Sequence, residues 1–201
     1  MMVVILGPDG SGKSSVIKGL LNISGTCFRD VDCYHLFPIR NFGGFHAAAR
    51  PVTEPHGLAA RGLLESVLKL GYYLVLYIGG YWLNIRSPSR AGGLIVFDRY
   101  YQDLLVDPLR YRYGGPMWLA RLVAKLIPQP DLWILLDAPA DVLQARKQEV
   151  PFEETARQRE AYLKLVGAMK NGVVVDASRN LDEVVGEVNA AIRRSMAEKA
   201  G

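Results

Sequence analysis

A glycine-rich segment constrains the fold of this chain more than any other feature. Gly7–Ser14 reads GPDGSGKS and matches the pattern G-x-x-x-x-G-K-[ST]. It follows the apolar run Met2–Leu6 and opens a helical pattern at Lys13. A loop of this kind between a buried strand and a helix turns its backbone N–H groups toward an anion, and the helix N-terminus adds positive potential. The sequence therefore predicts a phosphate-binding loop directly after the first strand.

Each residue type in this loop has an expected task. The glycines leave room for inward-turned backbone, Lys13 is expected to reach the β- and γ-phosphates of a bound nucleotide, and the Ser14 hydroxyl to ligate Mg²⁺. The residues of this loop, to which the family resemblance given below assigns ATP, are Gly7, Pro8, Asp9, Gly10, Ser11, Gly12, Lys13, Ser14 and Ser15.

Short apolar runs recur along the chain with helical patterns between them. Near-continuous apolar runs are typical of strands buried on both faces of a parallel sheet. The expected strands are Met2–Leu6, Gly93–Asp98, Asp131–Asp137 and Gly172–Asp176, with a fifth around Cys27–Cys33. The expected helices are Lys13–Leu21, Leu58–Ile85, Pro116–Ile127, Ala140–Gln148, Phe152–Lys170 and Leu181–Glu198, the last with Asn180 as its N-cap. This alternation predicts an α/β protein with the three-layer P-loop NTPase fold, a parallel five-stranded sheet and helices on both faces.

Length and composition favour a single domain over residues 1–201. Hydrophobic residues make up 50% and charged residues 22%, which excludes a disordered or fibrous chain. Cys27 and Cys33 cannot form a disulfide framework, and we expect a reduced, cytoplasmic setting. The net charge of +4 fits phosphate-bearing small molecules as well as nucleic acid.

One apolar stretch, Leu70–Ile85, carries no charged residue. A membrane span needs about 20 apolar residues, and this stretch is shorter and includes glycines, tyrosines and an asparagine. We therefore expect a buried helix and no stable membrane insertion.

A second carboxylate stands at the end of another strand. Asp98 closes the run GLIVFD and is followed by Arg99 and Tyr100. Ligands of parallel α/β sheets bind outside the carboxyl ends of the strands, so Asp98 and the phosphate-binding loop are expected at one edge. Asp98 would hold Mg²⁺ and Arg99 a second phosphate; the alternative is an Asp that only caps the next turn.

A cluster of charged residues follows the strand that ends at Asp137. Arg146, Lys147, Arg157 and Arg159 are interleaved with glutamates. Such a segment is either a solvated helix with mixed ion pairs or a short helical lid, approximately residues 146–160, that brings an arginine to the transferring phosphate. Arg146 and Arg157 are the preferred catalytic lid residues.

Together these motifs resemble the thymidylate kinase family of P-loop nucleoside monophosphate kinases, as a divergent member. GPDGSGKSS, FDRY, LDAPADVLQAR and TARQREAYLKL carry the resemblance. It implies that Asp9 contacts the acceptor sugar, that Asp98 and Arg99 serve metal and acceptor phosphate, and that a lid arginine is catalytic. It also implies a homodimer that uses ATP and Mg²⁺ on a small phosphate acceptor, with dTMP as the leading candidate and no nucleic-acid polymer as partner.

The acceptor side departs from the family pattern. The usual Arg-Glu-Pro-Gly-Gly-Thr segment is absent, Thr53–Gly57 being the nearest stretch, and YQDLLVDPLRYRYGGP follows the Asp-Arg-Tyr motif. Aromatic residues can stack on a base or sugar and arginines can hold phosphate. The acceptor pocket is therefore expected to draw on Asp9, Arg99, Tyr100 and Tyr81, with His35, Leu36, Arg40, Arg50 and His56 among the further candidates. For Tyr77, Tyr81 and Trp82 the favoured alternative is packing in the core or at a dimer interface, because they belong to one long helix.

Two alternative functions use the same motifs. A kinase of this fold could phosphorylate a hydroxyl of a nucleoside or sugar, with Asp98 or Asp9 as base. A nucleotide-binding regulatory module is the other, although the Asn-Lys-x-Asp segment of guanine-specific GTPases is absent. A third possibility is a nucleotide-binding protein that lies on a membrane through Leu70–Ile85, although the two-sided apolarity of this stretch favours burial.

Overall fold

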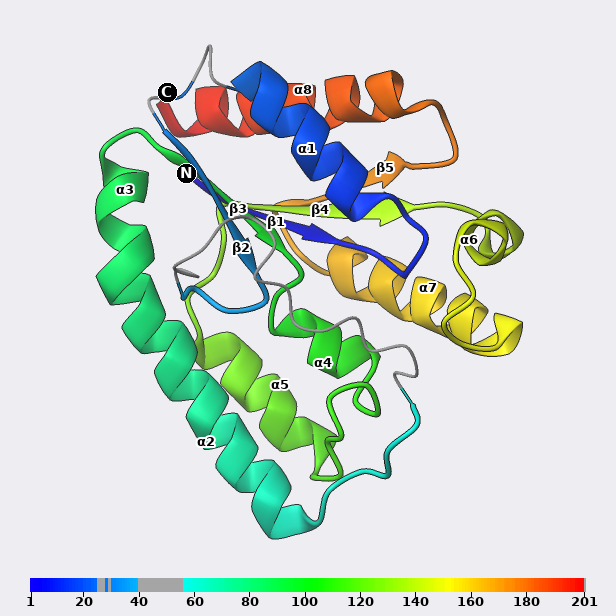
Figure 1. The fold of residues 1–201 in the computed structure, drawn as a ribbon. Coiled ribbons are helices and arrows are strands. Elements are labelled where there is room, and N and C mark those ends of the chain that lie inside the picture. Colours follow the sequence, from blue (N-terminus) through cyan, green and yellow to red (C-terminus); the bar gives the residue numbers. More distant parts are fainter. Residues whose placement is uncertain (25–27, 29, 40–55, 201) are drawn as a thin grey trace.

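The computed structural model describes residues 1–24, 28, 30–39 and 56–200 (Figure 1). Several residues named above lie outside the described ranges: Cys27, Arg40, Arg50 and Thr53 to Pro55.

Within the described residues the sheet has five strands, all parallel. They are β1 (Met2–Leu6), β2 (Val31–His35), β3 (Leu94–Asp98), β4 (Leu132–Asp137) and β5 (Gly172–Asp176), in the order β2-β3-β1-β4-β5. The central strand β1 pairs with β3 from Met2↔Ile95 and with β4 from Val3↔Leu132. The predicted parallel five-stranded sheet is confirmed, and its carboxyl ends meet at one edge.

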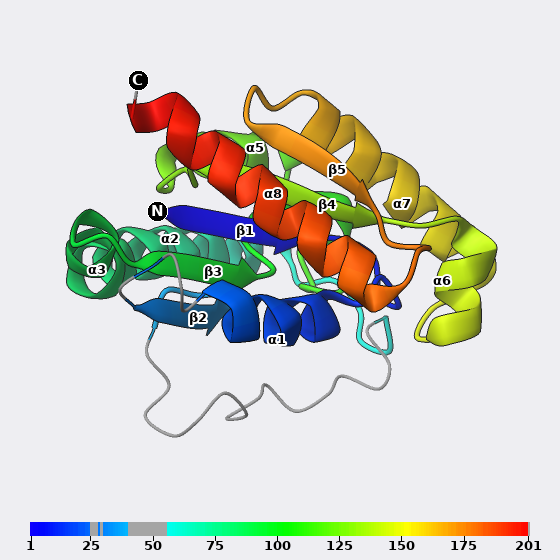
Figure 2. The ribbon, with the colours of Figure 1, turned by 90° about the horizontal axis from the view of Figure 1, so that it is seen from above.

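Helices cover both faces of the sheet, as predicted. Alternate side chains of β1 point to opposite sides, Met2, Val4 and Leu6 to one core cluster and Val3 and Ile5 to the other. The first cluster includes residues of α2 (Leu63–Gly80), α4 (Gln102–Val106), α5 (Met117–Leu126) and α7 (Phe152–Gly167). The second includes residues of α1 (Lys13–Ser24) and α8 (Leu181–Ala200), which lie together over the sheet in Figure 2. The result is a three-layer α/β sandwich.

The start of α8 has the predicted cap. The Asn180 side-chain oxygen accepts the backbone N–H of Glu183 at 2.9 Å, and the Glu183 carboxylate accepts the Asn180 amide. Such reciprocal capping satisfies N–H groups that an open helix start leaves without partners.

Two elements differ from the sequence prediction. The uncertain second strand is Val31–His35 rather than Cys27–Cys33, because an edge strand tolerates polar residues such as Asp32 and carries little apolar signal. The five-residue helix α4 was not expected, since it is too short to show a helical period; Asp103 stabilises its start by accepting the Tyr100 N–H at 2.9 Å.

The long apolar helix is buried on one face only, which corrects the expectation of a buried helix. Helix α2 continues through a π-helical turn (Tyr81–Ile85) into α3 (Arg86–Arg90). Leu70 and Tyr77 pack into the core because the sheet and α5 cover that side, whereas Leu68 is 65% exposed on the other side. The rod, residues 63–90, is long enough to span a membrane and contains an 18-residue window with a mean hydropathy of 1.2, of which 28% is buried; by length and composition alone, core helices of soluble proteins pass the same test.

Candidate functional site

The phosphate loop, Gly7–Ser15, is shaped by glycines that no larger residue could replace without strain. Gly10 has φ +85°, and a Cβ there would lie 2.5 Å from the carbonyl oxygen of Leu143 in α6 (Ala140–Arg146). Gly7 is similarly close-packed, since its Cβ would meet the Leu136 carbonyl oxygen at 2.7 Å. The loop therefore lies tightly between β4 and α6, and the N-terminus of α1 follows it directly.

Lys13 is buried and folded back on the loop. Its Nζ donates to the carbonyl oxygens of Gly7 at 2.7 Å and Pro8 at 2.9 Å. Burial, and next the nearby Arg99 guanidinium, lower the Lys13 pKa to about 8, although Asp98 and Asp9 oppose the shift. An anion in the loop would give this ammonium a stronger partner than the two carbonyls.

A main cavity of about 580 Å³ opens in front of the loop, within the volume range of small-molecule sites. Its lining brings together the phosphate loop, the ends of β2 and β3, the turn after α4 and the end of α6. The lining residues are Asp9, Gly10, Gly12, Lys13, Ser14, Ser15, His35, Leu36, Asp98, Arg99, Arg110, Tyr111, Arg146, Lys147 and Glu149.

Asp98 presents one carboxylate oxygen without a hydrogen-bond partner among the described residues. That buried oxygen is Oδ1, whereas Oδ2 lies 3.5 Å from Nδ1 of His35. Burial alone would raise the Asp98 pKa, but the hydrogen bond from His35 and the charge of Lys13 outweigh it and lower the pKa. Asp98 is thus a carboxylate with a free oxygen beside the phosphate loop.

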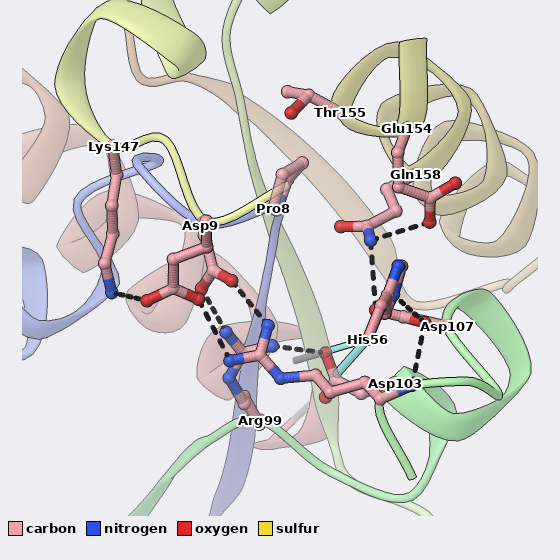
Figure 3. A network of polar contacts seen from close by, with 12 residues as sticks. Pro8, Asp9, His56, Arg99, Asp103, Asp107, Lys147, Glu154, Thr155 and Gln158 are labelled. Carbon is pink, nitrogen blue, oxygen red and sulfur yellow. Dashed lines mark hydrogen bonds and ion pairs between the residues drawn. The ribbon is translucent and has the colours of Figure 1, made fainter. Parts of the chain in front are cut away.

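Arg99 connects the end of β3 to the phosphate loop. Its backbone is left-handed, with φ +67°, a conformation that costs free energy in a non-glycine residue and is enriched at functional sites. The guanidinium is ion-paired with Asp9 and lies 3.4 Å from Asp103 (Figure 3). Burial would lower the Arg99 pKa, but Asp103 foremost, with Tyr162 and Asp9, raises it, so the group stays charged.

Asp9 is held from two sides. Besides Arg99, Arg110 approaches it, with Nη1 2.5 Å from Oδ2. Burial would raise the Asp9 pKa; the Arg99 charge, the hydrogen bond with Glu149 and the neighbouring cations together lower it well below its usual range. The carboxylate is therefore ionised and stabilises two converging guanidinium groups.

Sequence reasoning missed Arg110. It lies in the segment that departs from the family pattern, in the turn after α4, and its Nη2 also contacts Glu149 at 3.4 Å. The dense alternation of Arg110, Tyr111, Arg112 and Tyr113 was the available signal, but no motif gave it a role. Lys147 and Glu149, 2.5 Å apart, complete this side of the cavity.

A second polar network holds the turn that carries Arg110. The buried Asp107 carboxylate accepts the backbone N–H of Arg110 at 3.0 Å and lies 2.9 Å from Nε2 of His56. Gln158 of α7 donates to the same carboxylate at 3.0 Å (Figure 3). His56 was considered for the acceptor pocket, but here it fixes the turn and does not line the cavity.

The two predicted lid arginines have different surroundings. Arg146 ends α6, lines the main cavity and donates to the Ala177 carbonyl at 2.8 Å. Arg157 is not brought to the cavity; it pairs with Glu154 at 2.6 Å and donates to the Val106 carbonyl at 3.0 Å. Only the first part of segment 146–160 reaches the cavity, since the rest belongs to α7.

The predicted aromatic acceptor residues also lie away from the lining. Tyr100 is buried in the core with its hydroxyl donating to the Pro128 carbonyl at 2.9 Å. Tyr81 packs edge-on against Trp82 in the π-helical turn. His35 and Leu36, named as further candidates, do line the cavity.

A smaller cavity of about 240 Å³ adjoins the main one through Gly12, Ser15 and Arg146. Its other lining residues are Ser11, Val16, Ala177, Arg179, Leu181 and Val184. The two cavities place a mixed apolar and basic recess next to the phosphate loop.

Thymidylate kinases are among the known proteins that are similar to this chain. The chain is 33% identical to the probable thymidylate kinase 1 of Saccharolobus solfataricus over 125 residues, which are 57% of this chain and 62% of that relative. The match thus spans less than two thirds of the relative's length. No family model matches the chain.

A solved structure shares the whole fold. The thymidylate kinase from Ehrlichia chaffeensis superposes with a TM-score of 0.62 at 16% identity, covering 96% of this chain and 98% of that one. The chain therefore has the fold of a thymidylate kinase, and the sequence match over 125 residues confirms the resemblance to that family which its motifs indicate.

Proposed function

We propose that this protein transfers the γ-phosphoryl group of ATP to the phosphate of a nucleoside monophosphate, with dTMP as the leading acceptor. The observation that carries the proposal is the shared main cavity, which Lys13 of the phosphate loop and Arg99 after β3 both line. A donor phosphate at Lys13 and an acceptor phosphate at Arg99 would thereby face each other. The two similar thymidylate kinases support this choice of reaction.

The donor half fits ATP. The phosphate loop and the start of α1 supply backbone N–H groups and the Lys13 ammonium for the phosphates. The smaller cavity beside Gly12, lined by Arg146 and Arg179, offers a cationic and apolar recess for the nucleoside end.

The residues present also fit Mg²⁺. Ser14 and Asp98 both line the main cavity, and the partnerless Oδ1 of Asp98 is a hard oxygen ligand of the kind this cation takes. When bound there with ATP, Mg²⁺ would supply positive charge to the phosphates.

The chain's own contribution to transfer is positioning and charge. Lys13 would bind the donor phosphates, Arg99 would orient the acceptor, and Arg146 would neutralise charge that develops between them. In this structure Arg146 lines the cavity and Arg157 does not, so Arg146 is the lid arginine that we propose as catalytic.

We further expect a cytoplasmic homodimer with no nucleic-acid polymer as partner. The resemblance to thymidylate kinases implies a dimer, and the described surface offers an apolar face for it. This apolar face consists of exposed side chains of α2 and α5: Leu64, Leu68, Tyr72, Val75, Trp118, Leu122 and Leu126. A patch of this kind on a soluble chain marks an interaction site.

The test is ADP release from ATP and Mg²⁺ with dTMP, other nucleoside monophosphates, thymidine and sugars as acceptors. We expect turnover with dTMP and loss of at least about 100-fold in Lys13→Ala, whose fold should persist. Lys18→Ala, on the same helix but outside both cavities, is the matched control. Turnover with a free hydroxyl acceptor and with no monophosphate would show that the proposed acceptor class is wrong.

A further inference from the structure

Arg110 is positioned as a ligand-binding residue that no motif in the sequence assigns. Its side chain is 17% exposed, lines the main cavity and contacts Oδ2 of Asp9. Arg99, 11% exposed, reaches the other oxygen of the same carboxylate. Two guanidinium groups from separate elements thus converge on one anionic group.

The charge balance of the cavity favours an added anion. Its lining includes the cations Lys13, Arg99, Arg110, Arg146 and Lys147 against the carboxylates of Asp9, Asp98 and Glu149. The Asp9 and Glu149 carboxylates lie on the N–H donors of Arg110, at 2.5 and 3.4 Å. Planar guanidinium groups bind phosphate oxygens by the same paired geometry as carboxylates, so a phosphate can take these donors.

The backbone position of Arg110 is fixed by contacts that do not involve its guanidinium group. The turn is closed through the backbone, because Asp107 accepts the Arg110 N–H at 3.0 Å. His56 and Gln158 hold that carboxylate in turn, at 2.9 and 3.0 Å. The guanidinium is therefore not needed to hold the turn, and it pairs with Asp9 and Glu149 in the cavity on a backbone fixed in advance, which reduces the ordering cost of binding a ligand there.

Arg112, two residues further on, shows the contrast. Its guanidinium donates to the Ala59 carbonyl at 3.1 Å at the surface and does not line the main cavity. The same turn thus carries one arginine directed inward and one directed outward.

We propose that Arg110 and Arg99 together grip the phosphate group of the acceptor, and that Arg110 makes the protein select phosphorylated over unphosphorylated acceptors. The proposal rests on the proposed function and specifies it: the acceptor is a phosphate monoester. The segment after the Asp-Arg-Tyr motif, which departs from the family pattern, would then have a role on the acceptor side, where the family's usual Arg-Glu-Pro-Gly-Gly-Thr segment is absent.

The experiment compares binding of dTMP and thymidine, by calorimetry without ATP, in wild type, Arg110→Met, Arg110→Lys and Arg112→Met. Loss of charge-assisted hydrogen bonds to a dianion is expected to weaken dTMP binding by about 10- to 100-fold in Arg110→Met, with thymidine binding unchanged. Arg110→Lys should recover part of the difference, and Arg112→Met should match the wild type. In turnover, the KM for dTMP should rise while the KM for ATP stays constant.

The outcomes separate this inference from the function on which it rests. If wild type phosphorylates dTMP but Arg110→Met keeps the wild-type ratio of dTMP to thymidine affinity, the inference is wrong and the function stands. A rise in the KM for ATP alone would assign Arg110 to the donor and also overturn it. If wild type phosphorylates a nucleoside or sugar and no monophosphate, both are wrong. Should Arg110→Met fail to fold, Arg110→Lys decides by the same ratio.

Discussion

Among single residues, the buried ammonium of Lys13 couples nucleotide binding to the uptake of a proton. Its pKa is about 8 in the free protein because burial disfavours the charge. A bound triphosphate favours the charged form and raises that pKa. The unfolded chain also binds this proton more tightly, so the contribution of Lys13 to stability increases from about pH 8 to about pH 10.5.

We predict that ATP binding takes up a proton above about pH 8, and that affinity falls there by at most about tenfold per pH unit. Calorimetry at about pH 9 in two buffers of different ionisation enthalpy measures the uptake. Lys69, whose pKa burial also lowers to about 8, lies outside both cavities, so Lys69→Met should leave the uptake unchanged. Equal apparent enthalpies in the two buffers would contradict the prediction.

How far single residues could be predicted depends on whether their role is local. Lys13, Asp98 and Arg99 belong to short patterns with a known physical role, and all three line the main cavity. Arg110 reaches the cavity only through the packing of α4, α7 and His56 around Asp107, which no local pattern encodes. Arg157 shows the reverse: its neighbour Glu154, one helical turn back, holds it away from the cavity.

At the scale of elements, the phosphate loop and α6 are fitted to each other at Gly10. Gly10 and Gly12 have nearly the same backbone, with φ +85° and +83°. A Cβ at Gly12 would meet nothing within 4 Å, whereas one at Gly10 would lie 2.5 Å from a backbone oxygen of α6. Comparing substitutions at Gly10 and Gly12 therefore separates the cost of backbone strain from the cost of disturbing the contact between the phosphate loop and α6.

Gly12→Ala is expected to lower the free energy of unfolding by about 1–2 kcal/mol, the cost of a left-handed alanine. Gly10→Ala should lower it further, because α6 must also shift. Urea unfolding of both variants and of wild type measures the difference. Equal losses in the two variants would mean that α6 yields freely at this contact.

Elements with a strong apolar pattern could be predicted from the sequence, whereas a five-residue helix and an edge strand with polar residues could not. β1, β3 and β4 read as continuous apolar runs because both faces of the sheet are covered there, and β5 keeps such a run although it lies at an edge and Val174 is 44% exposed. The other edge strand, β2, includes Asp32 and His35 and shows no continuous run, and α4 has five residues, too few for the apolar spacing of a helix to repeat. The sequence predicted the long helix, but an apolar helix gives the same sequence pattern whether neighbouring elements cover one of its faces or two.

For the whole molecule, the apolar face on α2 and α5 is the surface that we propose as the dimer interface. Replacing Leu68 by Glu should convert a dimer into a monomer with the fold retained, because a charge would be buried at the interface. Phe152→Glu, at a 47% exposed position that begins α7, should leave the dimer intact. Sedimentation measures the state; a monomeric wild type, or one that partitions into liposomes, would refute the dimer.

The strand order has a consequence for how the chain is made. β1 is the central strand of the sheet, but its partner strands β3 and β4 begin only at Leu94 and Leu132. The five apolar residues of β1 therefore remain unpaired while most of the chain is synthesised. The phosphate loop also lacks its packing partners until late in synthesis, because Gly7 and Gly10 pack against Leu136 and Leu143. The nascent chain therefore carries an aggregation-prone strand through much of translation, and nucleotide can assist folding only after α6 has left the ribosome.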